Sequence, residues 1–133
     1  MLTGSCLCGR VSYEVDAELE GIAHCHCETC RKSHASAFAS IASAPRDRFR
    51  WTQGEDLLNT YESSPGKLRR FCSVCGSHLV AERVGHPNFM LRLGCLDTPV
   101  IVDRQQHIWR SDGASWYDPG KMLPELPEGL PRR

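Results

Sequence analysis

Eight cysteines dominate the chemistry that this 133-residue chain can carry. Seven of them fall into three short motifs and one, Cys95, stands alone. The motifs are Cys6-x-Cys8, Cys25-x-Cys27-x-x-Cys30 and Cys72-x-x-Cys75. Cysteines at these spacings can bring their sulfurs close enough to share one ion, and zinc prefers four such ligands in a tetrahedron. The spacing therefore favours thiolate metal sites over a disulfide framework.

Seven clustered cysteines divide as four plus three. The simplest partition joins Cys6, Cys8, Cys72 and Cys75 into one closed, structural site. It leaves Cys25, Cys27 and Cys30 as a three-ligand site with an open position, which is what a catalytic or ligand-binding zinc requires. In a rival partition a fourth protein ligand closes the second site, and the spacing does not separate the two partitions. The candidates for that ligand are Cys95, His24, His26 and His34.

Charge and hydropathy exclude several classes of partner. Lys and Arg number 16 and Asp and Glu number 16, so the formal net charge is zero, which argues against nucleic acid and anionic lipid as partners. No apolar run approaches the ~18–20 residues that span a bilayer. The first residues show neither the basic nor the apolar region of a secretory signal. We therefore expect a cytoplasmic protein whose cysteines are kept reduced, with no nucleic-acid or membrane partner.

Alternating and β-branched segments set the expected fold. Residues 11–15 alternate apolar and polar side chains with a period of two, as a half-buried strand does. Further short strands are expected at 48–52, 57–62, 68–72, 78–82 and 89–93, and one short helix at 28–33. The sequence predicts a mainly β fold: a single small zinc-binding domain over 1–133 of several coiled antiparallel sheets, with at most one or two short helices. Residues 119–133, rich in proline and glycine, are expected to form an irregular tail.

Other side chains have a structural and a functional interpretation. Cys95 is expected in the core, since a free cysteine is commonly a small buried hydrophobe. His26 is expected to be hydrogen-bonded beside the metal rather than bound to it. The three tryptophans are expected mainly in the core, although Trp109 or Trp116 could line a pocket.

The cysteine motifs and their neighbours resemble the glutathione-dependent formaldehyde-activating family. Three runs carry the resemblance, at residues 4–11, 26–32 and 71–79, and segments at 94–97, 107–109 and 116–117 occupy corresponding places. The resemblance covers residues 4 to 129 and implies a zinc fold of coiled β-sheets, similar to that of methionine-R-sulfoxide reductases. It also implies that the four-cysteine set binds a structural zinc and that the trio binds a second, catalytic zinc.

By this resemblance the chain is a carbon–sulfur lyase that joins glutathione, or a related thiol, to formaldehyde and gives S-(hydroxymethyl)glutathione. An open zinc can lower the pKa of a thiol from its usual ~8.5 or polarise an aldehyde oxygen. Three thiolates weaken the metal as a Lewis acid, so the site suits capture of a fourth soft ligand. Arg31 and Lys32 follow the trio and are expected to hold carboxylates of the thiol, or to offset the negative charge of the site. The alternative function is a non-catalytic zinc module for a small thiol or a partner protein.

Two positions depart from the family pattern. Ala35 stands where the family usually has a glycine, and it is a poor substitute if that backbone needs a positive φ. Cys95 stands where relatives tend to carry a small hydroxyl residue. Both departures leave the expected fold unchanged and concern which thiol or aldehyde the protein uses.

Overall fold

The computed structural model describes residues 1–131, and there the chain is mainly β, as predicted. Its strands are β1 (Leu2–Ser5), β2 (Ser12–Val15), β3 (Ile22–Cys25), β4 (Ala39–Pro45), β5 (Phe49–Gln53), β6 (Leu58–Ser64), β7 (Lys67–Cys72), β8 (His78–Arg83), β9 (Asn88–Arg92) and β10 (Gln105–Ile108). One α-helix, α1 (Glu28–His34), follows β3. Four 3-10 turns complete the elements: η1 (Arg46–Arg48), η2 (Glu55–Leu57), η3 (Leu93–Cys95) and η4 (Arg110–Asp112).

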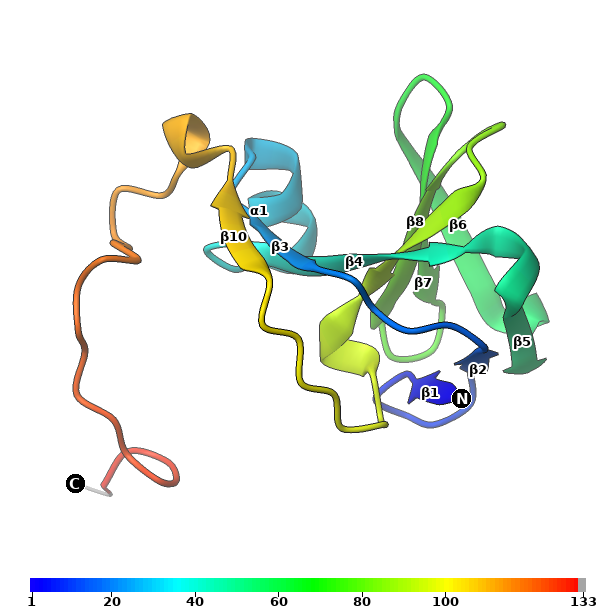
Figure 1. Ribbon diagram of the computed structural model, residues 1–133, viewed down its shortest axis with the longest axis horizontal. Helices are drawn as coiled ribbons and strands as arrows, with labels where there is room; N and C mark the ends of the chain where they lie inside the picture. Colours follow the sequence, from blue (N-terminus) through cyan, green and yellow to red (C-terminus); the bar gives the residue numbers. More distant parts are fainter. Residues whose placement is uncertain (132–133) are drawn as a thin grey trace.

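The strands form two sheets, of three and seven strands (Figure 1). The small sheet has the order β1-β2-β5, and the large one has the order β10-β3-β4-β9-β8-β7-β6. Neighbouring strands are antiparallel throughout, except that β10 runs parallel to β3. This parallel pair differs from the antiparallel prediction, and it places the segment after residue 104 beside the strand that leads into the cysteine trio.

Two groups of buried side chains hold these elements together. The larger group includes Val11, Tyr13, Leu79 and Leu91, each at most 1 % exposed, and it packs between the small sheet and strands of the large one. Two of its members, Cys6 and Cys72, belong to the four-cysteine set. The smaller group is built on Cys25, Cys30 and Ala39, with Ile41 and Ile108 against it. Both cysteine sets are thus part of the packed interior as well as candidate ligands.

The six predicted strands and the predicted helix are all present, with bounds shifted by at most two residues. Four strands were not predicted: β1, β3, β4 and β10. Residues 119–131 contain no helix or strand, and Figure 1 shows this segment running away from the sheets. Arg132 and Arg133, the end of the predicted tail, lie outside the described residues. The division into one domain with a 119–133 tail stays a prediction. No helix in the described part of the chain is long and apolar enough to cross a membrane.

Ala35 ends α1 in the left-handed conformation, with φ 49° and ψ 46°. This region costs an L-residue with a Cβ ~1–2 kcal/mol, and glycine avoids that cost. Part of the stability that glycine would add is offset, because glycine loses more backbone entropy on folding than alanine does. We therefore expect Ala35→Gly to raise the free energy of unfolding by about 0.5–1 kcal/mol, measured by urea titration.

Ala17→Gly is the comparison variant, because the backbone at Ala17 does not have a positive φ, and its methyl group also packs against the main core. There the added flexibility of the unfolded chain has no compensation, so the urea midpoint should fall. An Ala35→Gly variant that unfolds at the wild-type midpoint or below would show that the left-handed cap is not strained.

Candidate metal centres

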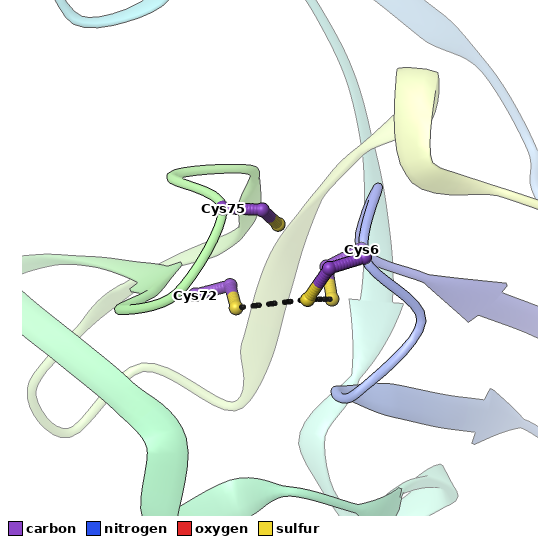
Figure 2. Close-up of side chains that lie close together, drawn as sticks. Cys6, Cys72 and Cys75 are labelled. Carbon is purple, nitrogen blue, oxygen red and sulfur yellow. Dashed lines mark hydrogen bonds between the residues drawn. The ribbon is translucent and has the colours of Figure 1, made fainter.

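The four-cysteine set is assembled from two loops that are distant in sequence. Cys6 and Cys8 lie between β1 and β2, Cys72 ends β7, and Cys75 lies in the turn before β8. Figure 2 shows the side chains of Cys6, Cys72 and Cys75 close together. All four Sγ atoms lie within 4.8 Å of one another. The Sγ atoms of Cys6 and Cys8 are 3.6 Å apart, and those of Cys8 and Cys72 are 3.8 Å apart. A zinc tetrahedron with ~2.3 Å Zn–S bonds has edges of ~3.8 Å, far longer than a ~2.05 Å disulfide. The donor set and its spacing therefore fit a metal ion.

A glycine follows the second cysteine of each pair and closes a turn there. Gly9 follows Cys8 and Gly76 follows Cys75, and both have φ 79°. The N–H of Gly9 donates to the Cys6 carbonyl at 3.0 Å, and that of Gly76 donates to the Cys72 carbonyl at 2.8 Å. A residue with a Cβ is disfavoured in this left-handed region. The two glycines thus close the turns that hold the sulfurs of each pair toward one site.

Local hydrogen bonds lower the pKa of Cys75 and, against the effect of burial, that of Cys6. Cys8 differs: although a backbone hydrogen bond from Arg10 acts to lower its pKa, desolvation and the neighbouring cysteines raise it to about 11. The N–H of Val11 donates to the Sγ of Cys6 at 3.3 Å. The Ser77 hydroxyl lies 3.3 Å from the Sγ of Cys75, and hydrogen bonds, that of Ser77 first, lower the pKa of Cys75 to about 5. Deprotonated sulfur is the form that binds metal.

The cysteine trio is held by β3 and the start of α1. Cys25 ends β3, Cys27 caps the helix, and Cys30 lies in its first turn. The Sγ of Cys27 accepts the N–H of Cys30 at 3.3 Å, so one sulfur both begins the helix and faces the other two. The three Sγ atoms lie within 4.8 Å of one another, with Cys25 and Cys30 each 5 % exposed. Three convergent sulfurs fit a soft divalent metal with one position left open.

Within residues 1–131 no fourth ligand joins the trio at that distance. The side chain of His24 lies between the Ser40 hydroxyl, 2.9 Å from its Nδ1, and Gln105, 2.8 Å from its Nε2. Cys95 lies near the other set and donates its S–H to the His78 carbonyl at 3.2 Å. Burial raises the pKa of Cys95 to about 11, which keeps it a thiol. The arrangement therefore favours the four-plus-three partition, with Cys95 packed against the main core as predicted.

His26, between two cysteines of the trio, is fully buried and has every polar atom engaged. Its N–H donates to the Ile108 carbonyl at 3.0 Å, and its carbonyl accepts from the Arg31 Nε at 3.3 Å. Arg110 donates to its Nδ1 at 3.3 Å, so Nε2 carries the proton and donates to the Nδ1 of His107 at 2.8 Å. This confirms the predicted hydrogen-bonded role of His26. Through these hydrogen bonds the segment at residues 107–110 stabilises the loop that carries the trio.

The trio opens into a cavity of about 590 Å³ that also carries an excess of positive charge. Its lining includes four basic and two acidic side chains: Lys67, Arg69, Arg83, Arg92, Glu28 and Asp112. Arg69 and Arg92 are 6 % and 5 % exposed, respectively, which is rare for arginine. None of these four cations was predicted from the sequence to belong to the site. Lys67 and Arg69 alternate on one strand, so a period of two would have placed them on one face.

Arg31 and Lys32, the predicted carboxylate-binding residues, do not line this cavity. Arg31 is held by the His26 carbonyl. Lys32 is exposed, pairs with Glu28 at 3.4 Å, and lines an adjoining cavity of about 560 Å³ that shares Arg69 with the first. The trio thus lines the first cavity, whereas Lys32 borders only the second.

The tryptophan prediction was wrong for two of three residues. Trp109 and Trp116 are 60 % and 72 % exposed, and only Trp51 packs against the core. Trp109 does line the cavity of the trio, which was the alternative considered for it. Its backbone has a positive φ of 58°, just before η4.

Comparison with known proteins agrees with this geometry. Residues 1–112 match the family model described as glutathione-dependent formaldehyde-activating enzyme. An uncharacterized lyase of Schizosaccharomyces pombe is 32 % identical over 76 residues, which cover 57 % of this chain and 53 % of that protein. The chain thus spans about half the length of this curated relative. A crystal structure of a Rhodobacter sphaeroides protein has the same fold, with a TM-score of 0.63 and 24 % identity, covering 78 % of this chain and 99 % of that one. Since the family model matches most of its length, the chain belongs to the glutathione-dependent formaldehyde-activating enzyme family.

Proposed function

We propose that the chain is a zinc-dependent carbon–sulfur lyase-type enzyme that joins glutathione, or a related thiol, to formaldehyde. The product is S-(hydroxymethyl)glutathione. One observation carries the proposal: three convergent cysteine sulfurs open into a cavity lined by four basic side chains and two acidic ones. The family match over residues 1–112 supports it, and so does the word lyase in the name of the yeast relative.

Two zinc ions per chain are part of this proposal. Cys6, Cys8, Cys72 and Cys75 would hold the structural ion, and Cys25, Cys27 and Cys30 would hold the catalytic one. Zinc supplies a soft, positively charged position at which a thiol loses its proton near neutral pH. Thiolate ligation requires a reducing compartment, so we place the protein in the cytoplasm.

The cations around the trio would bind and orient the thiol. Glutathione carries two carboxylates, and the guanidinium of Arg69 and the ammonium of Lys67 lie in the cavity to receive one of them. Lys32 and Arg69 border the adjoining cavity, where the second carboxylate would lie. Arg31 is fixed against the loop of the trio and would offset its negative charge. These cations select an anionic thiol over a neutral one.

Calorimetry with two thiols tests the binding part. Glutathione is expected to bind the zinc-loaded wild type and not Cys27→Ser, because that variant lacks one sulfur of the trio. Cysteamine, a thiol without a carboxylate, should bind the wild type at least about tenfold more weakly, the value of one lost charge-assisted hydrogen bond. Cys95→Ser is the matched control and should bind glutathione as the wild type does, since Cys95 lies outside the trio.

Exchange NMR tests the reaction, because the uncatalysed addition is itself fast and end-point assays do not separate the two. The wild type should accelerate exchange between glutathione and S-(hydroxymethyl)glutathione, and Cys27→Ser should not. Glutathione binding without acceleration would replace the enzyme with the alternative, a non-catalytic zinc module for a small thiol. Failure to bind any thiol, with a fourth protein ligand on the second metal, would leave only a module for a partner protein.

A further inference from the structure

One buried cation beside the trio has no partner of its own. Arg92 ends β9, is 5 % exposed, and lines the cavity that holds Cys25, Cys27 and Cys30. Among residues 1–131 its guanidinium makes no hydrogen bond or ion pair, and its nitrogens are not among the fully buried atoms that lack a partner, so they remain accessible from the cavity. The other buried cation of the cavity, Arg69, donates to the hydroxyls of Ser63 and Ser33 at 2.9 and 3.3 Å. Arg92 therefore differs from Arg69 in keeping its donors free.

A free buried guanidinium is costly and needs a compensating anion. Taking an unpaired charge out of water costs several kcal/mol, so such arginines are rare in protein interiors. Burial lowers the pKa of Arg92 to about 10, while the thiolates of Cys30, Cys25 and Cys27 raise it. Arginine keeps its charge at neutral pH, and Arg92 lines the same cavity as the three cysteines of the trio. Its compensating charge comes from the trio and from whatever binds there.

The proposed reaction generates a negative charge that the trio does not stabilise. A thiolate sulfur adds to the aldehyde carbon and forms the C–S bond, and the C=O π pair moves to the oxygen. That oxygen then takes a proton from water, which replaces the proton the thiol released. Three thiolate ligands leave a metal a weak Lewis acid, so the developing alkoxide needs another donor. A preorganised cation in a water-poor cavity is effective for this purpose.

We propose that Arg92 is a catalytic residue: its guanidinium donates hydrogen bonds to the aldehyde oxygen and stabilises the alkoxide as the C–S bond forms. The inference rests on the proposed function and adds the group that activates the aldehyde. It also assigns different roles to the residues that line the cavity. Arg69, Lys67 and the trio bind the thiol, whereas Arg92 binds the aldehyde.

Arg92→Met is the variant of choice, since it removes a buried unpaired charge while keeping an unbranched side chain and should therefore fold. At equal zinc occupancy, exchange NMR should show a loss of at least about 100-fold in catalysed rate, with the glutathione Kd changed by less than about threefold. Arg92→Lys keeps the charge but not the planar fork and should retain part of the rate. Arg70→Met is the control. Arg70 follows Arg69 on β7 but does not line the cavity, so this variant should leave the rate unchanged.

A second readout does not depend on turnover. Formate resembles the aldehyde in size and carries the oxyanion, so ¹³C-formate should bind the glutathione-saturated wild type. Line broadening should show binding at least about tenfold weaker to Arg92→Met. Equal formate binding, or an unchanged rate, would overturn the role of Arg92 and leave the proposed function standing. A rate and a glutathione affinity that fall by the same factor would overturn it too, because Arg92 would then hold the thiol. A wild type that binds glutathione without accelerating exchange would instead refute the proposed function.

Discussion

Cys72→Ser is expected to lower the free energy of unfolding by at least about 4 kcal/mol, and the melting temperature by more than about 10 °C. Cys72 is fully buried in the main core, and a metal held by the four-cysteine set would link it to Cys8, 64 residues away in sequence. The unfolded chain has no preformed site, so the free energy of metal binding contributes directly to folding. Serine removes one ligand and leaves a buried hydroxyl. Thermal unfolding followed by circular dichroism, with zinc counted per chain, measures both effects.

Cys95→Ser is the control for that experiment. Cys95 is half-buried, packs against the same core and donates only to the His78 carbonyl, so its loss should leave two zinc ions and shift the melting temperature by a few degrees at most. If Cys72→Ser kept the wild-type stability with one zinc fewer, the four-cysteine set would not be structural. If instead Cys95→Ser lost a zinc, Cys95 would be a ligand and the second site would be closed.

Periodicity predicted the strands whose side chains are large and missed those whose side chains are small or polar. Strands β2, β5 and β9 carry aromatic or branched residues on one face, which is a strong signal. Strand β4 is built largely from alanine and serine, and β10 begins with two glutamines. Alanine is a weak strand former, so only the neighbours of β4 on both sides make it one. The parallel pairing of β10 with β3 is a long-range contact that no local pattern encodes.

The cysteine sets could be predicted because their spacing is local and their chemistry is specific. The cations of the cavity could not, because β7, β8 and β9 bring them to the trio through strand pairing. Lys32 lies two residues after Cys30 and therefore ~200° around the helix from it, so it borders the adjoining cavity rather than that of the trio. Its role in binding a carboxylate stays a prediction. The family resemblance agreed with the ligand sets that the spacing indicated, and the left-handed backbone at Ala35 is a conformation that glycine adopts more readily than alanine.

A mild chelator is expected to remove the two metals in separate phases, with the first zinc leaving at least about tenfold faster than the second. The trio offers three protein ligands and opens into a cavity, so a chelator can occupy the fourth position before any Zn–S bond breaks. In the four-cysteine set every position is filled by sulfur, although Cys8 is exposed. There the chelator must displace a ligand whose release also loosens the core around Cys72.

The release of zinc, followed with a colorimetric chelator beside circular dichroism, should therefore show a fast phase of one ion per chain with no change in the β signal. The slow phase should accompany unfolding, because the four-cysteine set joins the loop of Cys6 to the turn of Cys75. Glutathione, by filling the open position, should slow the fast phase, and Cys27→Ser should lack that phase altogether. Loss of both ions in one step, or unfolding with the first, would mean that the two sets do not divide into an open site and a closed one. Since the proposed thiol chemistry needs the open position, that result would remove its physical basis as well.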